Sequence, residues 1–414
     1  MARPSSLVCI RCGAASALTT YARGCGVCAA AGVAANLTVA YDSPLSSARP
    51  VLARASMWRF DAWLPVDASD AVTLGEGNTP LVPVPKLGLG RLWIKDESRN
   101  PTWSFKDRLA SASVSMAVKL GAQVIASSSS GNAGAATAAY AAKAGLPCIV
   151  VTYQSAAGPM VTQMRAYGAM VLTVPTSADR WRVLSAAVER FGWYPTSVYY
   201  GPAVGSNPYG IEGYKTIAYE IAEALDWQSP DWCVLPVCYG DALYGMWKGF
   251  EEMRRFGWID RVPRFAAAEI SGSIEAAMDS GVDQPPVRER STPTIAGSIG
   301  ASQGTYQGVH ALRASNGVAM YVDDDAMLAW QEKLARSEGI WTEPSAAATL
   351  PVIERLRARG VIERDATVVA LMTAGGLKDP DMANQRLGHL PAAKGDVDDA
   401  LRVLKEAYGF DARA

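Results

Sequence analysis

The feature that most constrains the fold is an alternation of short apolar runs with longer helical stretches. Apolar runs of strand length lie at 123–126, 147–152, 169–174, 232–237, 264–270 and 366–372. Helical stretches lie between most of them, at 106–120, 133–145, 157–167, 178–191, 211–225, 242–256, 325–338 and 345–359. This alternation predicts an α/β fold in which parallel-rich sheets are flanked by helices. Ligands of such folds gather at the carboxyl ends of the strands, so the loops after the apolar runs are candidate sites.

Length and charge limit the classes of partner. A chain of 414 residues is long enough for two domains with buried cores. Its 39 Lys and Arg residues nearly balance its 40 Asp and Glu residues, so no net field attracts nucleic acid or an anionic membrane. No stretch is long and apolar enough to cross a bilayer, and the first residues lack the apolar core of a secretory signal. We therefore expect a cytoplasmic protein with no nucleic-acid or membrane partner.

Four of the seven cysteines form two C-x-x-C pairs near the N-terminus. Cys9 and Cys12 form the first pair, and Cys25 and Cys28 form the second, twelve residues further on. Four thiolates at this spacing can surround one Zn²⁺ ion tetrahedrally, and a site closed by four cysteines is structural. The alternatives are disulfides, which a reducing compartment disfavours, and a site without metal. The segment carries too few basic residues to follow nucleic-acid phosphates.

Lys106 is the candidate catalytic residue. The run 91–95 has the pattern of a short strand, and Asn100-Pro101 then turns the chain. A helix that begins after Ser104, capped by Ser104 or Thr102, places Lys106 in its first turn. The positive end of the helix dipole disfavours an ammonium there, so the lysine is poised to lose its proton and attack a carbonyl group. The alternative is a solvated surface lysine.

Two loops at strand-to-helix junctions are candidate anion sites. The first, 127–134, contains four serines and leads into an alanine-rich helix. Free backbone N–H groups and hydroxyls at a helix start suit a carboxylate, and the alternative is a flexible serine turn. The second loop, 236–245, has a geometry suited to phosphate, but Asp241 would stand near a dianion. We therefore expect the Asp241 carboxylate to turn away, as the helix cap.

A third loop, 371–380, follows the last apolar run. Thr373 lies at the carboxyl end of the expected strand, where its hydroxyl can reach a bound ring. A simple turn built on Gly375 and Gly376 is the competing explanation.

Seven motifs, in order along the chain, resemble those of threonine synthase and, more broadly, of the tryptophan-synthase-β or fold-type II pyridoxal phosphate enzymes. They are Gly-Glu-Gly-Asn-Thr-Pro-Leu (75–81), Asn-Pro-Thr-x-Ser-Phe-Lys-Asp-Arg (100–108), Ser-Ser-Gly-Asn (129–132), Asn-Pro-Tyr-x-Ile-Glu-Gly (207–213), Thr-Ile-Ala (294–296), Glu-Pro-Ser-Ala-Ala (343–347) and Gly-Gly-Leu-Lys-Asp (375–379). The cysteine pairs, ending in Tyr41-Asp42, also resemble the N-terminal ribbon of many threonine synthases.

The resemblance extends from about residue 9 to residue 380 and implies a domain organisation. The expected parts are a zinc-ribbon-like segment at 1–42, a large cofactor-binding α/β domain at 43–110 and 205–390, a small α/β domain at 111–204, and a C-terminal helix or tail at 391–414. Family members are commonly dimers, so a homodimer is expected as well.

The resemblance also implies roles around the cofactor, pyridoxal 5'-phosphate. Lys106 would form a Schiff base with it and would later move the α-proton of the substrate. Phe105 would pack near its ring, Asn132 would bond its phenolic oxygen, and Thr373 would face its pyridine nitrogen. A hydroxyl at that nitrogen leaves it largely unprotonated, which tunes the electronics of the cofactor.

Two more residue sets follow from the resemblance. The backbone that would hold the cofactor phosphate consists of Cys238, Tyr239, Gly240, Asp241, Ala242 and Leu243. The residues expected to meet the amino-acid substrate are Ser129, Ser130 and Asn132, which would hold its carboxylate, and Trp103 beside the lysine.

Several positions depart from the threonine synthase pattern. Trp103 replaces a glycine, Gly210 replaces an arginine that can serve the substrate phosphate, and Tyr214 replaces a glutamine. The phosphate loop is also poorer in glycine and asparagine than in the family. Loss of a guanidinium removes a charge-assisted contact commonly worth about 1.5–3 kcal/mol. These differences favour a substrate other than O-phosphohomoserine. The alternative for Trp103 and Gly210 is neutral substitution that is compensated elsewhere in the chain.

Three functions follow. The preferred one is a lyase or synthase that uses pyridoxal phosphate, removes the α-proton of an amino acid, and expels or replaces a group on the β- or γ-carbon. The second is an authentic threonine synthase acting on O-phosphohomoserine. The third is a non-catalytic sensor or scaffold that binds cofactor poorly, suggested by Asp241 in the phosphate loop.

Overall fold

The computed structural model describes residues 3–50, 56–154 and 158–411, which form two compact units. Residues 1–378 belong to the first unit and residues 379–414 to the second.

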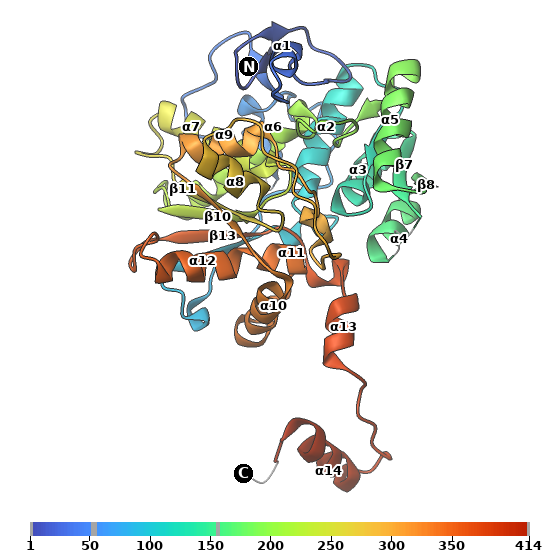
Figure 1. The fold of residues 1–414 in the computed structure, drawn as a ribbon, viewed down its shortest axis with the longest axis vertical. Helices are drawn as coiled ribbons and strands as arrows, with labels where there is room; N and C mark the ends of the chain where they lie inside the picture. The colour runs from blue at the N-terminus through green and yellow to red at the C-terminus, as the bar shows by residue number, and fades with distance from the viewer. Residues whose placement is uncertain (1–2, 51–55, 155–157, 412–414) are drawn as a thin grey trace. The chain divides into compact units, whose positions relative to one another are not determined.

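A six-stranded sheet lies in the first unit (Figure 1). Its order is β12-β11-β10-β13-β5-β4, and all neighbours are parallel except β4 and β5. The strands are β4 (Leu81–Pro83), β5 (Leu92–Asp96), β10 (Trp232–Pro236), β11 (Arg264–Glu269), β12 (Val318–Tyr321) and β13 (Val368–Met372). Every residue of β10 and β13 is buried, as expected for parallel strands covered on both faces.

Helices cover both faces of this sheet because consecutive strand residues point in opposite directions. Cys233 and Leu235 of β10 share a core with helices α6 to α9, whereas Trp232 and Val234 share a core with α10 and α12. The helices are α6 (Pro208–Ala224), α7 (Asp241–Arg255), α8 (Ser273–Ser280), α9 (Tyr306–Ala314), α10 (Asp324–Glu338), α11 (Pro344–Ala347) and α12 (Thr349–Ala358).

A second sheet, of order β8-β7-β6-β9, is parallel throughout. Its strands are β6 (Ile125–Ser128), β7 (Cys148–Tyr153), β8 (Met170–Val174) and β9 (Tyr194–Pro195). The helices that accompany it in Figure 1 are α2 (Lys106–Lys119), α3 (Asn132–Ala144), α4 (Pro159–Ala166) and α5 (Ser177–Phe191). Alanines of α3 pack with α2 and β7, whereas Leu184 and Val188 of α5 form a separate core with Ala126.

The N-terminal segment is a small antiparallel sheet of order β2-β1-β3 with one short helix. Its elements are β1 (Pro4–Cys9), β2 (Ala15–Ser16), α1 (Gly26–Ala30) and β3 (Leu37–Tyr41). Several hydrogen bonds attach it to α6 and α7. Lys248 donates to Thr38 Oγ1 at 2.8 Å, and the Tyr41 hydroxyl donates to Glu212 at 3.0 Å.

A buried ion network joins β5 to α2 and α6. Arg108 donates to Glu97 Oε2 and to Glu220 Oε2, both at 2.7 Å, and Lys95 donates to the same Glu220 oxygen at 2.7 Å. Burial favours the neutral form of Glu220, but the charges of Arg108 and Lys95 outweigh it and hold its pKa well below the usual range. The network fixes the first turns of α2, the helix that carries Lys106.

Short 3₁₀ segments and a C-terminal pair of helices complete the described elements. The 3₁₀ segments are Met57–Trp63, Pro85–Leu87, Glu97–Arg99, Gly297–Ile299 and Gly376–Lys378. The second unit contains α13 (Asp381–Leu387) and α14 (Val397–Tyr408), neither of which has a buried residue. Among the helices described, none combines the length and the apolar character needed to cross a lipid bilayer.

The predicted α/β fold is confirmed, and its elements need three corrections. All six apolar runs are strands, with ends shifted by no more than a few residues. The helix expected at 345–359 is two helices, α11 and α12, and that at 157–167 is Pro159–Ala166, with residue 157 outside the described residues. Strands β9 and β12 and helices α8 and α9 were not predicted.

Candidate active site

Lys106 begins helix α2, directly after a loop that is bonded to the end of β13. The backbone N–H of Phe105 donates to the carbonyl oxygen of Thr373 at 2.8 Å. The Lys106 amine lies 4.5 Å from the centre of the Phe105 ring and 5.7 Å from the centre of the Tyr214 ring. No hydrogen bond or ion pair to the amine is found among the described residues. Lys106 as a whole residue keeps partial exposure.

Burial lowers the pKa of the Lys106 amine, and the nearby Asp241, Cys238 and Glu343 oppose that change. The predicted direction is therefore present, but its main cause is desolvation by the surrounding protein rather than the helix dipole. The Cys238 thiol is itself neutral, because burial raises its pKa to about 11. A lysine in these surroundings has the reactivity needed to attack a carbonyl carbon.

Glu343 connects two of the predicted site residues. It follows the Thr342 bridge to Gly375 and precedes α11. Its Oε2 accepts from Asn132 Nδ2 at 2.9 Å, and its Oε1 accepts from Thr373 Oγ1 at 3.3 Å. Burial raises the pKa of Glu343, although these bonds lower it. Sequence reasoning recognised the motif of Glu343 but gave this residue no role.

The serine loop (residues 127–131) leads into α3, as predicted. Ser129 Oγ accepts from the N–H of Gly131 at 3.2 Å. In the described structure no hydrogen bond uses the backbone N–H groups of Asn132, Ala133 and Gly134, as expected for the first turn of a helix. The Oδ1 atom of Asn132 is also buried without a hydrogen-bond partner. Ser129 and Ser130 remain partly exposed, so the loop has donors that a carboxylate can reach.

The phosphate loop (residues 238–243) runs from β10 into α7. Gly240 has a φ of 76°, and a Cβ there would lie 2.8 Å from Gly308 Cα, so only glycine fits. The backbone N–H groups of Gly240, Asp241, Ala242 and Leu243 make no hydrogen bond within the described residues. Four such groups at the start of a 15-residue helix suit a phosphate.

The Asp241 carboxylate turns away, as expected, but it is not the cap. Its Oδ1 accepts from the N–H of Ser206 at 2.8 Å and from Gln307 at 2.6 Å, and its Oδ2 accepts from the Ser206 hydroxyl at 2.7 Å. Gly240 is the N-cap of α7. These three bonds satisfy the carboxylate, so it leaves the free N–H groups of the loop available to a ligand.

The predicted cap of α2 is wrong. Phe105 is its N-cap and makes no side-chain bond to the helix, and the Ser104 hydroxyl is buried without a partner. Thr102 contacts Asp107 instead, donating from its hydroxyl at 2.8 Å. The Asp107 carboxylate thus accepts from the loop before the helix.

The three positions that depart from the family pattern have different surroundings. Trp103 has a φ of 64°, a left-handed conformation that favours glycine, and its side chain is 55% exposed. A Cβ at Gly210 would lie 2.9 Å from the backbone oxygen of Leu109, so this position is filled by the packing of α6 on α2. Tyr214 stacks on Phe105 with ring centres 5.2 Å apart, and its buried hydroxyl has no partner.

Two buried ionisable residues, Asp107 and Lys378, were missed by sequence reasoning. Burial raises the pKa of Asp107 to about 7 and lowers the pKa of Lys378 to about 8. Lys378 donates to the backbone oxygen of Thr102 at 3.1 Å and to Gln163 of α4 at 2.5 Å. Their signal in the sequence was only their presence in the motifs 100–108 and 375–379.

We expect Asp107 to make the protein less stable as the pH rises from about 4 to about 7. Its pKa is 3.8 when unperturbed and about 7 in the fold, so the folded state binds this proton more tightly than the unfolded state. That stabilising contribution is complete below the unfolded pKa and is lost as the pH rises through the folded pKa. The contribution of Asp107 to the free energy of unfolding should fall by up to about 1.4 kcal/mol per pH unit as the pH rises.

Denaturant unfolding of Asp107→Asn and of the exposed control Asp70→Asn, across this pH window, tests the prediction. The control should keep the wild-type slope, whereas Asp107→Asn should lose the part due to Asp107. An unchanged slope in Asp107→Asn would assign the pH dependence to other groups.

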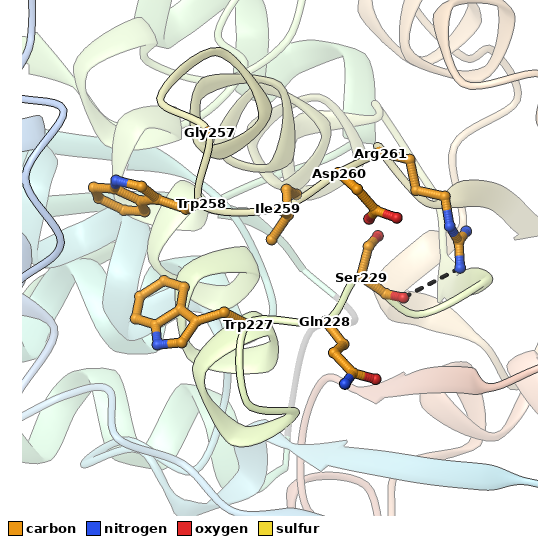
Figure 2. Close-up of a pocket in the computed structure, with 8 residues that line it drawn as sticks. All are labelled: Trp227, Gln228, Ser229, Gly257, Trp258, Ile259, Asp260 and Arg261. Carbon is orange, nitrogen blue, oxygen red and sulfur yellow. Dashed lines mark hydrogen bonds between the residues drawn. The ribbon is translucent and has the colours of Figure 1, made fainter.

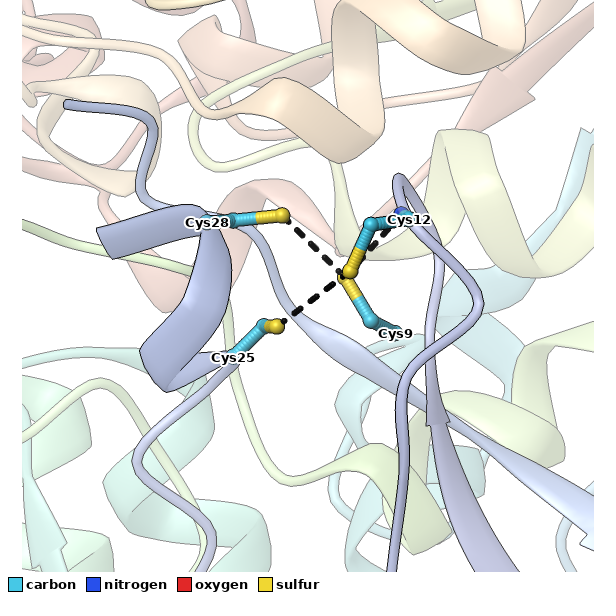
Figure 3. Close-up of side chains that lie close together, drawn as sticks. All are labelled: Cys9, Cys12, Cys25 and Cys28. Atoms are coloured by element: carbon cyan, nitrogen blue, oxygen red, sulfur yellow. Dashed lines mark hydrogen bonds between the residues drawn. The ribbon is translucent and has the colours of Figure 1, made fainter. Parts of the chain in front are cut away.

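The four N-terminal cysteines converge, as Figure 3 shows. Their sulfur atoms all lie within 4.8 Å of one another. All four are free thiols, with Cys12 exposed and the other three buried. The cluster matches the predicted set of four ligands.

A separate cavity of about 410 Å³ lies away from these residues (Figure 2). It is formed by the segments that follow α6 and α7, and its lining residues are Trp227, Gln228, Ser229, Gly257, Trp258, Ile259, Asp260 and Arg261. It adjoins the C-terminal end of α7, whereas the phosphate loop adjoins the N-terminal end. None of the predicted site residues lines it.

The sequence and the fold both match known proteins. A family model described as pyridoxal-phosphate dependent enzyme matches residues 72–374. Threonine synthase of Methanocaldococcus jannaschii is 35% identical over 84% of this chain and 87% of its own length. Threonine synthase of Methanosarcina acetivorans is 38% identical over 78% and 80%. The solved structure of maize serine racemase superposes with a TM-score of 0.63, at 21% identity, over 75% of this chain and 92% of that one, which shows a shared fold.

Proposed function

Because this chain belongs to the pyridoxal-phosphate dependent enzymes and is homologous to threonine synthases, we propose that it removes the α-proton of an amino acid and then expels or replaces a group on the β- or γ-carbon. The observation that carries this proposal is the unpaired Lys106 amine, which lies near the phosphate loop at the start of α7. Hydrogen bonds connect the residue before it, Phe105, to Thr373, and Thr373 to Glu343. Glu343 in turn accepts a hydrogen bond from Asn132 at the start of α3. Bound pyridoxal phosphate supplies an electron sink for the carbanion that proton removal leaves.

The residues present fit that cofactor. The free N–H groups of the phosphate loop provide donors for its phosphate, and Lys106 provides the amine for its aldehyde. Asn132 has a buried Oδ1 without a partner, and its amide nitrogen can be shared with a ring oxygen. Thr373 and Glu343 lie at the carboxyl end of β13, where a ring nitrogen would be met. No acidic side chain needs to move to admit a dianion, because Asp241 is already bonded to Ser206 and Gln307.

The residues of the site would have different roles in the reaction. Lys106, with its lowered pKa, can accept the α-proton of the substrate and return it. The Ser129 and Ser130 hydroxyls and the start of α3 would hold the substrate carboxylate and orient its Cα–H bond. Trp103, exposed beside the lysine, would cover the substrate from solvent. The altered pocket thus belongs to this proposal, with Trp103 and Tyr214 as its distinguishing side chains.

A spectrophotometric screen of amino acids against the holoprotein tests the function. A substrate should shift the visible band of the bound cofactor and release a product. Phosphate release from O-phosphohomoserine at a rate comparable with other substrates would favour an authentic threonine synthase. A protein that stays colourless after incubation with pyridoxal phosphate would contradict both enzyme functions and favour the scaffold.

We also propose that the four cysteines hold a structural Zn²⁺ ion. Residues 111–204 are proposed to form a small domain between the two parts of the large one. A homodimer is proposed as the assembly. The zinc is supported by four thiols that can converge on one ion. The two parallel sheets support the domain division.

We expect about one zinc ion per purified chain, by elemental analysis. Replacing Cys9 and Cys28 with serine should remove it and lower the thermal stability, because three of the four thiols are buried and the segment has only a small core. Cys148→Ser, in β7, should keep the metal. Equal metal content in both variants would place zinc elsewhere.

A further inference from the structure

Arg180 lies at the same end of the four-stranded sheet as the serine loop. It is in the first turn of α5, which follows β8. Tyr153 ends the neighbouring strand β7, and the Arg180 guanidinium carbon lies 5.3 Å from the centre of its ring. The serine loop follows β6, the next strand of the sheet. Because these strands are parallel, the three segments lie at the same end of the sheet.

No acidic side chain neutralises Arg180 within the part of the chain that the structure describes. Its guanidinium donates to the backbone oxygen of Ser177 at 3.3 Å and to the Ser177 hydroxyl at 2.6 Å. The adjacent Asp179 is occupied elsewhere: its carboxylate accepts from the Thr176 hydroxyl at 2.8 Å and from Arg182 at 2.6 Å.

The surroundings of Arg180 are partly dry and contain aromatic groups. Burial lowers its pKa, and only Tyr239 and Tyr153 act in the opposite direction. Tyr239, one of these two groups, is a residue of the phosphate loop. Taking a guanidinium partly out of water without a counter-charge is unfavourable, and stacking on Tyr153 compensates only in part. A bound anion would supply the missing negative charge.

Building on the proposed function, we propose that Arg180 binds a carboxylate at the far end of the substrate side chain. The substrate is then an amino acid whose β- or γ-carbon carries the leaving group and whose side chain ends in a second carboxylate, and aspartate and glutamate serve as binding probes for that carboxylate. The ends of β6 and β8 are two strand spacings apart, about 10 Å, with the end of β7 between them, a separation comparable with the length of an extended amino acid that has two carboxylates. The planar guanidinium can form two parallel bonds with a carboxylate.

The charge of the site distinguishes a carboxylate from a phosphate. A phosphate of the substrate is a dianion near neutral pH and is commonly met by several cationic or backbone donors. Arg180 is a single positive charge, and among the described residues it has no ion-pair partner. One guanidinium matches a monoanion. The departure from the threonine synthase pattern at Gly210 agrees with this, because the fold leaves no room for a side chain there.

Matched pairs of amino acids test the proposal in the holoprotein. L-Aspartate is compared with L-asparagine, L-glutamate with L-glutamine, and O-phospho-L-homoserine is added as the phosphate probe. The dissociation constant of each is measured from the spectral change of the bound cofactor. We expect one acidic amino acid to bind about 10- to 100-fold more tightly than its amide, and more tightly than the phosphate probe.

Three variants complete the test. Arg180→Gln should abolish the preference for the acid over the amide, and Arg180→Lys should retain part of it. Arg182→Gln, on the exposed side of the same helix, is the matched control and should keep the full preference. Equal binding of acid and amide by the wild type, a preference that survives Arg180→Gln, or a preference for the phosphate probe would overturn the inference.

The two proposals fail in different ways. If no amino acid changes the spectrum of a cofactor-loaded protein, the proposed function fails. If neutral amino acids change it but acidic ones have no advantage that depends on Arg180, only the assignment of Arg180 fails.

Discussion

Lys106→Ala should abolish covalent capture of pyridoxal phosphate and lower turnover by at least about 10⁴-fold, the upper end for loss of a positioned proton-transfer group. The amine is the only part of the residue that can hold the cofactor aldehyde, and alanine leaves nothing in its place. Reduction of the wild-type holoprotein with borohydride, followed by peptide mass spectrometry, should find the cofactor on the peptide that contains Lys106. The alanine variant should yield no such peptide.

The matched control is Lys119→Ala, at the exposed last turn of the same helix. It should behave as the wild type in both capture and turnover. The phosphate loop stays intact in Lys106→Ala, so the variant should still bind the cofactor without a covalent bond, which equilibrium dialysis can measure. Capture at another lysine, Lys378 above all, would assign the reactive amine to that residue instead.

The fold followed closely from the sequence where burial is complete. The strands β10 and β13 are buried on both faces, so their residues are apolar without interruption and their position is easy to read. The strand β12 was missed because it pairs with only one neighbour and two of its four residues, Val318 and Ala319, are only half-buried. The short helices α8 and α9 lie among glycines and serines, which hide their periodicity.

The site was predicted in parts, because its loops could be placed at strand ends but their contacts could not. Position placed Lys106, Thr373 and the serine loop each after an apolar run, and the family resemblance assigned all three to one cofactor. The link through Glu343, and the burial that lowers the pKa of Lys106, depend on segments far apart in the sequence. No local pattern shows a left-handed φ at Trp103 either, since tryptophan rarely adopts one. Such features arise only when the whole chain is packed.

Arg108→Met should lower the free energy of unfolding by about 3–5 kcal/mol at pH near 8, the usual cost of breaking a buried ion pair by removing one partner. Arg108 is fully buried and contacts both Glu97 and Glu220. Methionine fills a similar volume but leaves both carboxylates in a dry environment, with only Lys95 to pair with Glu220. Chemical denaturation measures the loss, and Arg254→Met, which removes an exposed pair with Glu251, is the control and should change little.

The pH dependence of that loss identifies its cause. In the wild type the pKa of Glu97 and of Glu220 is lowered, so their contribution is present above the unfolded pKa and lost as the pH falls. In Arg108→Met the unpaired carboxylates should take up protons at mildly acidic pH, so that they are no longer buried charges. The difference in the free energy of unfolding between wild type and variant should therefore become smaller at that pH. The double variant Arg108→Met with Glu97→Gln should recover part of the loss for the same reason. If the difference in the free energy of unfolding stays constant with pH, and the double variant recovers no stability, the loss comes from packing. The start of α2 would then be held by its apolar core rather than by charge.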